Sequence, residues 1–427
     1  MTVQDQLSGA TTPDAGSSPE GHLQESGDEE LAYPEGGLDA WLIVLGAWCA
    51  MIPSMGLLNT MAVLHAYVSE NQLSHISQSA SGWTFSIYAF LLYFCPIFDA
   101  HNAGMLLIPG SIGIVASVMA LSLSMEYYQF ILSFGVLGGI SASLLFYLSI
   151  AAIGHWFNER RALATGIACT AGGLGGIAFP LIILYSAPHI GFGWSMRIIG
   201  FICTASCLAA CFLIKKRLPP NRSGCSSIDL KALRDPIFGV TTLTVFCVEF
   251  ACFVPYTYIS SYAIYAGMGA EAAHLLNTLL NAGAVLGRAL PGYVADRHGA
   301  FNIMSITVIV CMVIIYSSWL TLGSKEAMIQ AFTVLFGFWS GAAISLTPVC
   351  IGRVSQTKDL GKRSGTAFCV SSFAGLTGIP VAGAILEANG GSYRGLILLT
   401  GGFHVITSIA FVGARGVTGC WRPKAVV

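Results

Sequence analysis

The stretch HWFNERRALATGIACTAGGLGG, from His155 to Gly176, places two adjacent arginines and a glutamate directly before an apolar segment that contains five glycines. Soluble helices rarely combine these features. In a bilayer, by contrast, small residues allow neighbouring helices to approach closely, and Gly172 and Gly176 lie one helical turn apart. The stretch therefore predicts a charged turn that leads into a tightly packed membrane helix, which Pro180 then bends.

The composition of the whole chain indicates the same environment. Of its 427 residues, 55% are hydrophobic and 10% are charged, whereas an ordinary globular domain has about 25% charged residues. A single soluble core cannot bury so much apolar surface, so lipid must be the solvent for most of it. We therefore expect an all-α polytopic membrane protein. The formal net charge of −1 and the absence of a basic face in the sequence exclude nucleic acid as a partner.

Long apolar runs separated by short polar breaks predict twelve membrane-spanning helices, each of which needs about 20 mainly apolar residues. The longest internal break, Lys215 to Asp235, divides six spans from six. The expected spans are residues 40–64, 82–98, 103–124, 128–153, 162–184, 194–214, 237–264, 272–294, 301–322, 327–352, 364–386 and 395–414.

The segment before the first span has a composition of its own. Residues 1–39 contain no Lys or Arg and nine Asp or Glu. Such a segment buries too little apolar surface to offset the entropy of ordering, and it lacks the pattern of a cleavable signal peptide. The predicted organisation is an acidic disordered tail (1–39), two six-helix halves (40–214 and 237–414), an inter-half loop (215–236) and a short C-terminal tail (415–427).

Positive charges set the expected orientation, because Lys and Arg are retained on the cytoplasmic side of a membrane. With both termini in the cytoplasm, 17 of the 20 Lys and Arg residues fall on that side. Only Arg197, Lys325 and Arg394 lie toward the other side. The opposite orientation would invert this ratio, so we expect both termini to be cytoplasmic.

Charged residues recur in the two halves at one offset. Asp99 follows span 2 and Asp296 follows span 8, a separation of 296 − 99 = 197 residues. The basic pairs that precede spans 5 and 11 end at Arg161 and Arg363, a separation of 363 − 161 = 202 residues. This repetition indicates a parallel duplication of a six-helix unit, with a substrate path between the halves.

The duplicated pattern resembles the major facilitator superfamily. The segment GRALPGYVADRHG, Gly287 to Gly299, is similar to that superfamily's signature between helices 8 and 9, in which a Gly allows close helix contact while an Asp and an Arg brace the cytoplasmic gate. In the first half, CPIFDAHNAG keeps Asp99 but has Cys95 and Ala100 at the Gly and Arg positions. The resemblance implies a gate, braced differently in the two halves, formed by Asp99, Arg160, Arg161, Gly292, Asp296 and Arg297.

Within the superfamily, three segments are similar to the monocarboxylate-porter group, particularly its fungal branch. They are YPEGGLDAWLIVLGAW (Tyr33 to Trp48) at the entry to helix 1, WFNERRALATGIACTAGG (Trp156 to Gly173) at the entry to helix 5, and PYTYISSYA (Pro255 to Ala263) at the end of helix 7. The resemblance implies a secondary transporter that alternates access for a small organic molecule, such as an organic acid or a carboxyl-bearing secondary metabolite. Efflux across the plasma membrane fits the fungal branch, and a vacuolar or other organelle membrane is the alternative.

Ionisable groups inside spans are the first candidates for function, because each is costly to hold away from water unless it is paired or used. Glu249 is the only carboxylate well inside a predicted span. Since burial favours the neutral form of a carboxyl group, Glu249 is a candidate for coupling protons to cargo, although it could instead face a water-filled cavity or pair with a neighbouring helix. His65, at the outer end of span 1, is a second candidate proton relay, and a packed interfacial histidine is the alternative.

Arg288 aligns with the arginine that engages the substrate carboxylate in the monocarboxylate group, and its planar guanidinium suits that task. The alternative is a role in the gate beside Asp296. Two positions depart from the group's pattern: its acidic partner on helix 8 is Ala284 here, and its helix 1 lysine is Asn59. These changes favour a larger or less acidic cargo, with hydrogen bonds from Asn59 and with Tyr256 and Tyr258 lining the cavity.

The sequence contains no motif for nucleotide binding, metal binding or enzymatic catalysis. The glycines around Gly172 follow a helical run and no GxxxxGK[ST] occurs, so we expect no nucleotide, no cofactor and an ion or substrate gradient as the energy source. Cys203, Cys207 and Cys211 repeat at helical spacing without a His or carboxylate, so we expect no metal site. We expect no enzyme, and a non-transporting receptor built on a transporter fold is the alternative function.

Overall fold

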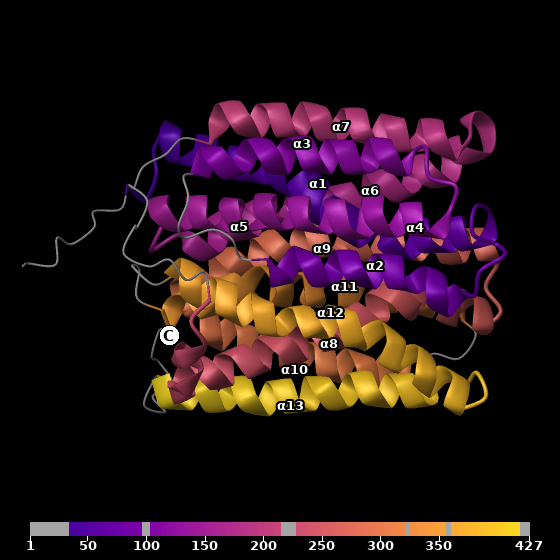
Figure 1. Cartoon of the computed structure of the whole chain (residues 1–427). Helices are drawn as coiled ribbons and strands as arrows, with labels where there is room; N and C mark the ends of the chain where they lie inside the picture. Colours follow the sequence, from indigo (N-terminus) through magenta and orange to yellow (C-terminus); the bar gives the residue numbers. More distant parts are fainter. Residues whose placement is uncertain (1–33, 96–102, 215–227, 322–324, 356–359, 419–427) are drawn as a thin grey trace, which may run out of the picture. The chain divides into compact units, whose positions relative to one another are not determined.

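The computed structural model describes residues 34–95, 103–214, 228–321, 325–355 and 360–418. In these residues all regular structure is helical, and long helices lie alongside one another (Figure 1). Counting consecutive helical pieces as one span, the described residues hold twelve long segments, six on each side of the inter-half break, which confirms the predicted fold class. Asp99 and the acidic N-terminal tail lie outside the described residues, except for the part of that tail from Pro34 onward.

The first six segments are α1, α2, α3, a composite fourth segment, α6 and α7. Their bounds are Leu38–Glu70 (α1), Gln78–Phe94 (α2), Ala103–Leu121 (α3), Tyr127–Phe130 (α4) continuing through the π-helical Ile131–Gly138 (η1) into Gly139–Trp156 (α5), Arg161–Ile190 (α6) and Phe192–Leu213 (α7).

The last six segments follow the short 3-10 helix Leu230–Arg234 (η2). Their bounds are Pro236–Tyr265 (α8), Ala270–His298 (α9), Ala300–Ile314 (α10) continuing into the π-helical Ile315–Trp319 (η3), Glu326–Arg353 (α11), Leu360–Ala388 (α12) and Arg394–Thr418 (α13). Two of the sharpest corners fall at Gly191 (φ 82°) and Gly299 (φ 92°), where a side chain would strain the left-handed backbone.

Nine of the described helical segments are long and apolar enough to cross a membrane. The other three predicted spans correspond to α2 and α3, whose described apolar runs are short, and to α9, which is less apolar. In α9 the polar side chains of Asn277, Asn281 and Arg288 are almost fully buried, so they face other helices rather than lipid. Polar residues that a membrane-spanning helix holds inside the bundle are candidates for a functional site.

Two kinds of seam join the helices of the two halves. Between α6 and α9 the seam is made of small residues, and a Cβ added at Gly292 would lie 2.5 Å from the Ala162 carbonyl oxygen. Between α2 and α12 the seam is aromatic, with Tyr93 stacked on Phe368 at a ring separation of 5.6 Å. Close backbone approach therefore holds one side of the bundle, while ring packing fills the other.

Candidate functional site

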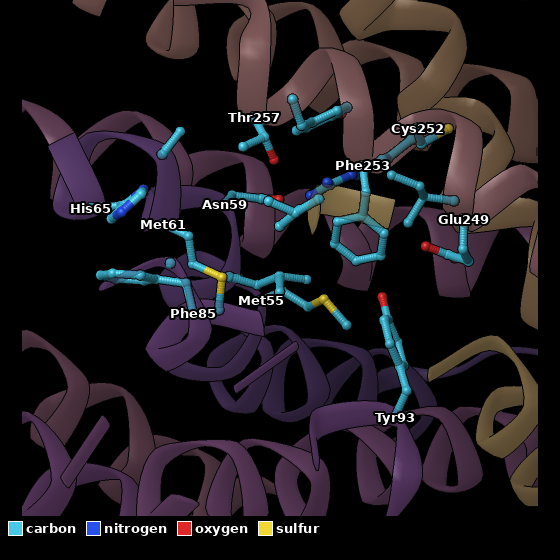
Figure 2. Close-up of a pocket in the computed structure, with 17 residues that line it drawn as sticks. Met55, Asn59, Met61, His65, Phe85, Tyr93, Glu249, Cys252, Phe253 and Thr257 are labelled. Carbon is cyan, nitrogen blue, oxygen red and sulfur yellow. The ribbon is translucent and has the colours of Figure 1, made fainter. Parts of the chain in front are cut away.

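A cavity lies between helices of both halves. Its volume is about 800 Å³, counting the space that opens to solvent, which is within the range of small-molecule sites. Its walls come from the second half of α1, from α2, from the middle of α8, and from single residues of α9, α11 and α12. Figure 2 shows the side chains of Met55, Asn59, Met61, His65 and Phe85 on one side and those of Glu249, Phe253 and Thr257 on the other.

Three polar side chains that line the cavity, Tyr93, Glu249 and Arg288, are almost fully buried, and we call this group the cavity floor. They come from α2, α8 and α9 respectively, so the floor joins the two halves. Each side chain is about 2% exposed. Figure 2 shows the Tyr93 hydroxyl and the Glu249 carboxyl directed into the same region, beside the Phe253 ring. The structure thus brings together the two charged residues that the sequence singled out separately.

Glu249 lies in the floor without a partner. Its carboxyl group makes no hydrogen bond and no ion pair with any residue in the described part of the chain. An isolated buried carboxylate is costly, so a proton, a water or a bound molecule has to compensate it. Glu249 therefore faces the cavity and does not pair with a neighbouring described helix, and its role in proton coupling stays a prediction.

Arg288 is held partly by the protein backbone. One terminal nitrogen, Nη1, donates to the Cys169 carbonyl oxygen of α6 at 2.9 Å, while Nε is buried without a hydrogen-bond partner among the described residues. The Arg288 carbonyl oxygen accepts a bond from the Ser345 hydroxyl of α11 at 3.2 Å. The side chain therefore spans the α6–α9 seam and also lines the cavity.

Asn59 lines the cavity beside a chain of asparagines. Its amide nitrogen donates to the Gly172 carbonyl oxygen at 2.8 Å, and its backbone carbonyl accepts from the Asn277 amide at 3.0 Å. The Asn281 side-chain amide in turn donates to the Asn277 backbone carbonyl oxygen at 2.9 Å. Sequence reasoning missed Asn277 and Asn281, because it followed charge; the low hydropathy of the span 8 region was the signal available.

The remaining predicted cavity residues occupy different places. Tyr256 lines the cavity, and its hydroxyl oxygen accepts from Ser340 at 3.4 Å. Tyr258 is not among the lining residues, and its hydroxyl donates to the Ile379 carbonyl at 3.0 Å. His65 lines the cavity toward its outer part, with Nε2 2.9 Å from the Ser81 hydroxyl. Tyr93 lies in the floor, although no sequence pattern distinguished it from the other aromatic residues.

One end of the bundle is closed by contacts between the halves. We call it the basic end, because Arg160, Arg161, Arg297 and Arg353 lie there, where α6 begins and α9 ends. The Asp296 carboxylate of α9 accepts from the backbone N–H groups of Ala162 (2.9 Å) and Leu163 (2.8 Å) in the first turn of α6. Those N–H groups have no acceptor within their own helix, so the acid closes the basic end by capping it.

A second carboxylate binds the turn that leads into the same helix. Glu35 Oε1 accepts from the backbone N–H groups of Asn158 (2.7 Å) and Glu159 (2.8 Å), and Oε2 accepts from that of Arg160 (3.2 Å). Glu35 and the Asn158–Arg160 turn, which belong to two of the segments that carry the family resemblance, therefore meet in space. The start of α6 is held by Glu35 from within its own half and by Asp296 from the other half.

The basic residues of the predicted gate have separate environments. Arg160 is exposed, whereas Arg161 is buried and donates to the carbonyl oxygens of Phe157 (3.2 Å) and Gly154 (3.0 Å). Arg297 is exposed and lies over the Tyr293 ring at 4.3 Å. A Cβ at Gly352 of α11 would lie 2.8 Å from the Arg161 guanidinium, so Arg161 lies against the other half.

Comparisons with known proteins agree with this geometry. A family model described as Major Facilitator Superfamily matches residues 43–332. The MFS transporter asaE of Aspergillus flavus is 35% identical over 396 residues, covering 89% of each chain. The aspyridones efflux protein apdF of Emericella nidulans is 34% identical over 372 residues, covering 85% of this chain and 75% of that protein.

A solved structure has the same fold. The fucose:proton symporter FucP of E. coli aligns with a TM-score of 0.67, covering 88% of this chain and 98% of that chain. The sequences are 16% identical, so this similarity concerns the arrangement of the helices alone.

Proposed function

The chain belongs to the Major Facilitator Superfamily of membrane transporters, and we propose that it is a secondary transporter for an organic acid or a carboxyl-bearing secondary metabolite. The observation that carries this proposal is the cavity between the halves, whose floor holds a buried, unpartnered carboxyl group and a guanidinium. A cargo carboxyl group would meet Arg288, while Glu249 would take up and release a proton as the halves rock.

In an alternating-access cycle, the Asp296 bonds and the cavity would have different roles in the closed and open forms. The Asp296 bonds join the two halves at the basic end, while the cavity is lined from the second half of α1 and the middle of α8. Opening the basic end would break these bonds and expose the cavity floor to the other side. We place the basic end in the cytoplasm, since basic residues concentrate on that side, with both termini cytoplasmic.

Efflux across the plasma membrane is the direction that we propose. The similarity to apdF, which is named for the efflux of aspyridones, supports this direction. In the cycle, cargo would enter from the basic end, contact Arg288, and leave on the opposite side as Glu249 exchanges its proton. The energy would come from a proton gradient.

Flux through the purified protein tests the proposal. The full chain in liposomes would be supplied with a panel of radiolabelled aliphatic and aromatic carboxylates and a pH gradient, with flux into protein-free liposomes subtracted. We expect Glu249→Gln to abolish the response to the gradient while cargo exchange at equal pH continues. Glu271→Gln, the same change at an exposed position of α9, is the matched control.

Arg288 is tested in the same system. Arg288→Ala should raise the half-saturating cargo concentration by about tenfold or more, as expected for losing a charge-assisted hydrogen bond, whereas the exposed Arg297→Ala should change it little. Gradient-driven flux that is unchanged in Glu249→Gln would refute proton coupling through this residue. Binding of cargo without movement under any gradient would favour the receptor function.

A further inference from the structure

The polar groups of the cavity floor that lack hydrogen-bond partners indicate which chemical group of the cargo binds there. The Tyr93 hydroxyl and the Glu249 carboxyl each make no hydrogen bond with another described residue, and the guanidinium of Arg288, which lines the same cavity, makes one hydrogen bond, from Nη1. Polar groups inside proteins are normally paired. Unused hydrogen-bonding capacity in one place therefore specifies a complementary group on the bound molecule.

The position of Tyr93 is fixed independently of any cargo. Its ring stacks on Phe368 with an interplanar angle of 10°, and it meets Phe146 edge-on at 5.6 Å. The Tyr147 hydroxyl donates to its carbonyl oxygen at 2.6 Å. Because the packing holds the ring, the hydroxyl points into the cavity as a preorganised donor and acceptor.

Charge balance distinguishes two kinds of head group. The floor holds one cation and one carboxyl group, so a carboxylate or sulfonate that reaches Arg288 also comes close to the Glu249 oxygens. A neutral group with an acceptor and a donor avoids this conflict: its carbonyl oxygen accepts from Tyr93 or Arg288, and its N–H or O–H donates to Glu249. Like charges held together in a buried site are strongly disfavoured.

The rest of the cavity suits an apolar body. Met55 and Met61 of α1, Phe85 of α2 and Phe253 of α8 line the walls, and Figure 2 shows Met55 and Phe253 near Tyr93, with Met61 and Phe85 farther away. Thioether and aromatic side chains accommodate ring systems of varied shape. The polar floor and apolar walls therefore divide the site into a head-group position and a body position.

Resting on the transporter function proposed above, we infer that the cavity selects a ring-bearing molecule by a neutral head group that both donates and accepts hydrogen bonds, and that Tyr93 is a specificity-determining residue that contacts it. An amide, a lactam, an enolised carbonyl group or an undissociated carboxylic acid has this chemistry. A carboxyl-bearing cargo would then enter the site together with its own proton.

Three naphthalene probes substituted at the same ring position separate the head groups. Naphthamide donates and accepts, methyl naphthoate only accepts, and naphthalenesulfonate is a permanent anion. Equilibrium dialysis against the purified full chain at mildly alkaline pH, which favours the ionised form of a carboxyl group, gives each Kd. The Ala62→Trp variant, whose indole would fill the cavity at a lining position, corrects for uptake by detergent.

We expect the amide to bind about tenfold more tightly than the ester, the difference made by one hydrogen bond to a charged group, and more tightly than the sulfonate by at least as much. Glu249→Gln should strengthen sulfonate binding about tenfold and weaken amide binding by only about threefold, because Gln still accepts a hydrogen bond but no longer a charge-assisted one. Tyr93→Phe should weaken the amide and the ester alike by about fivefold, the contribution of one ordinary hydrogen bond, and preserve the discrimination against the sulfonate.

Sulfonate binding that equals or exceeds amide binding in the unmodified chain would overturn the inference, as would failure of all three probes to bind. Equal losses of every probe in Tyr93→Phe would reduce Tyr93 to a packing role. This test can fail independently of the proposed function. If sulfonate is transported as fast as amide, the protein is a transporter with another selectivity. If the probes bind in the expected order but none is transported, the head-group selection holds and the transport function is wrong.

Discussion

The bonds from Asp296 to the first turn of α6 make a quantitative prediction about the closed basic end. In Asp296→Asn, one amide oxygen can still accept from Ala162 or Leu163, but the amide nitrogen cannot accept from the other. One charge-assisted bond is lost and the other becomes neutral. A hydrogen bond to a charged group contributes about 1.5–3 kcal/mol and a neutral one about 1 kcal/mol.

The size of the effect follows from where Asp296 lies. Its side chain is of intermediate exposure, so solvent screening places the loss near the lower end of that range, at about 2 kcal/mol. Since 1.4 kcal/mol is a factor of ten in an equilibrium constant, the open form of the basic end should become about 30-fold more populated.

Hydrogen exchange at the start of α6 measures this change directly, because opening exposes the Ala162 and Leu163 N–H groups that Asp296 now protects. Peptides covering this turn should exchange about 30-fold faster in Asp296→Asn. Asp235→Asn is the matched control: Asp235 caps α8 through the Ile237 N–H (3.1 Å) and pairs with Arg363 (3.5 Å), and α8 and α12 both belong to the second half. Unchanged protection in Asp296→Asn, or equal loss in Asp235→Asn, would show that Asp296 does not hold the halves together.

Three further perturbations test other parts of the account. Gly292→Ala should lower the free energy of unfolding by about 1–3 kcal/mol, measured by thermal unfolding, because its Cβ would lie 2.5 Å from the Ala162 carbonyl oxygen. The control Gly413→Ala, at an open position of α13, should be neutral or stabilising by up to about 1 kcal/mol. Equal effects of the two substitutions would contradict the close packing at Gly292. Glu35→Gln should lower the unfolding free energy by about 1 kcal/mol, because it weakens three bonds to the Asn158–Arg160 backbone, and a loss no larger than that of the exposed Glu159→Gln would count against this cap. Tyr256→Phe should change the half-saturating cargo concentration in the flux assay, because Tyr256 lines the cavity. Tyr258→Phe should leave that concentration unchanged and lower only the melting temperature, because its hydroxyl bonds the Ile379 carbonyl instead. A change in half-saturation for Tyr258→Phe but not for Tyr256→Phe would exchange their roles.

Much of the fold was predictable from the sequence, since a lipid environment leaves few options for the backbone. The apolar runs located twelve helices, and the described bounds extend most of them by a few residues; α2, for example, begins at Gln78 rather than near residue 82. The N-terminal extension follows from Ser77, whose side chain accepts from the Ala80 N–H. A run of polar letters such as QSAS does not reveal that a cap is present.

The candidate site was predictable only in part. Glu249 and Arg288 stand out because charges inside spans are rare, but their meeting in one cavity depends on the rotation of α8 and α9, which periodicity does not determine. Tyr93 carries no charge, and aromatic residues also form interfacial belts, so only the structure distinguishes it. Tyr258 shows the converse: two residues from Tyr256 on a helix, its hydroxyl is instead used by the Ile379 carbonyl.

The central claim is that cargo passes through the cavity between the halves, and plugging that cavity tests it most directly. Ala62→Trp introduces an indole at a lining position of α1, whereas Ala205→Trp introduces the same group at an exposed position of α7. Flux of the panel compound with the largest protein-dependent transport is measured for both variants in liposomes, with correct folding checked by thermal unfolding. We expect folded Ala62→Trp to lose flux by more than about tenfold, an added barrier above about 1.4 kcal/mol, and Ala205→Trp to retain it. Undiminished flux in folded Ala62→Trp would show that cargo does not pass through this cavity.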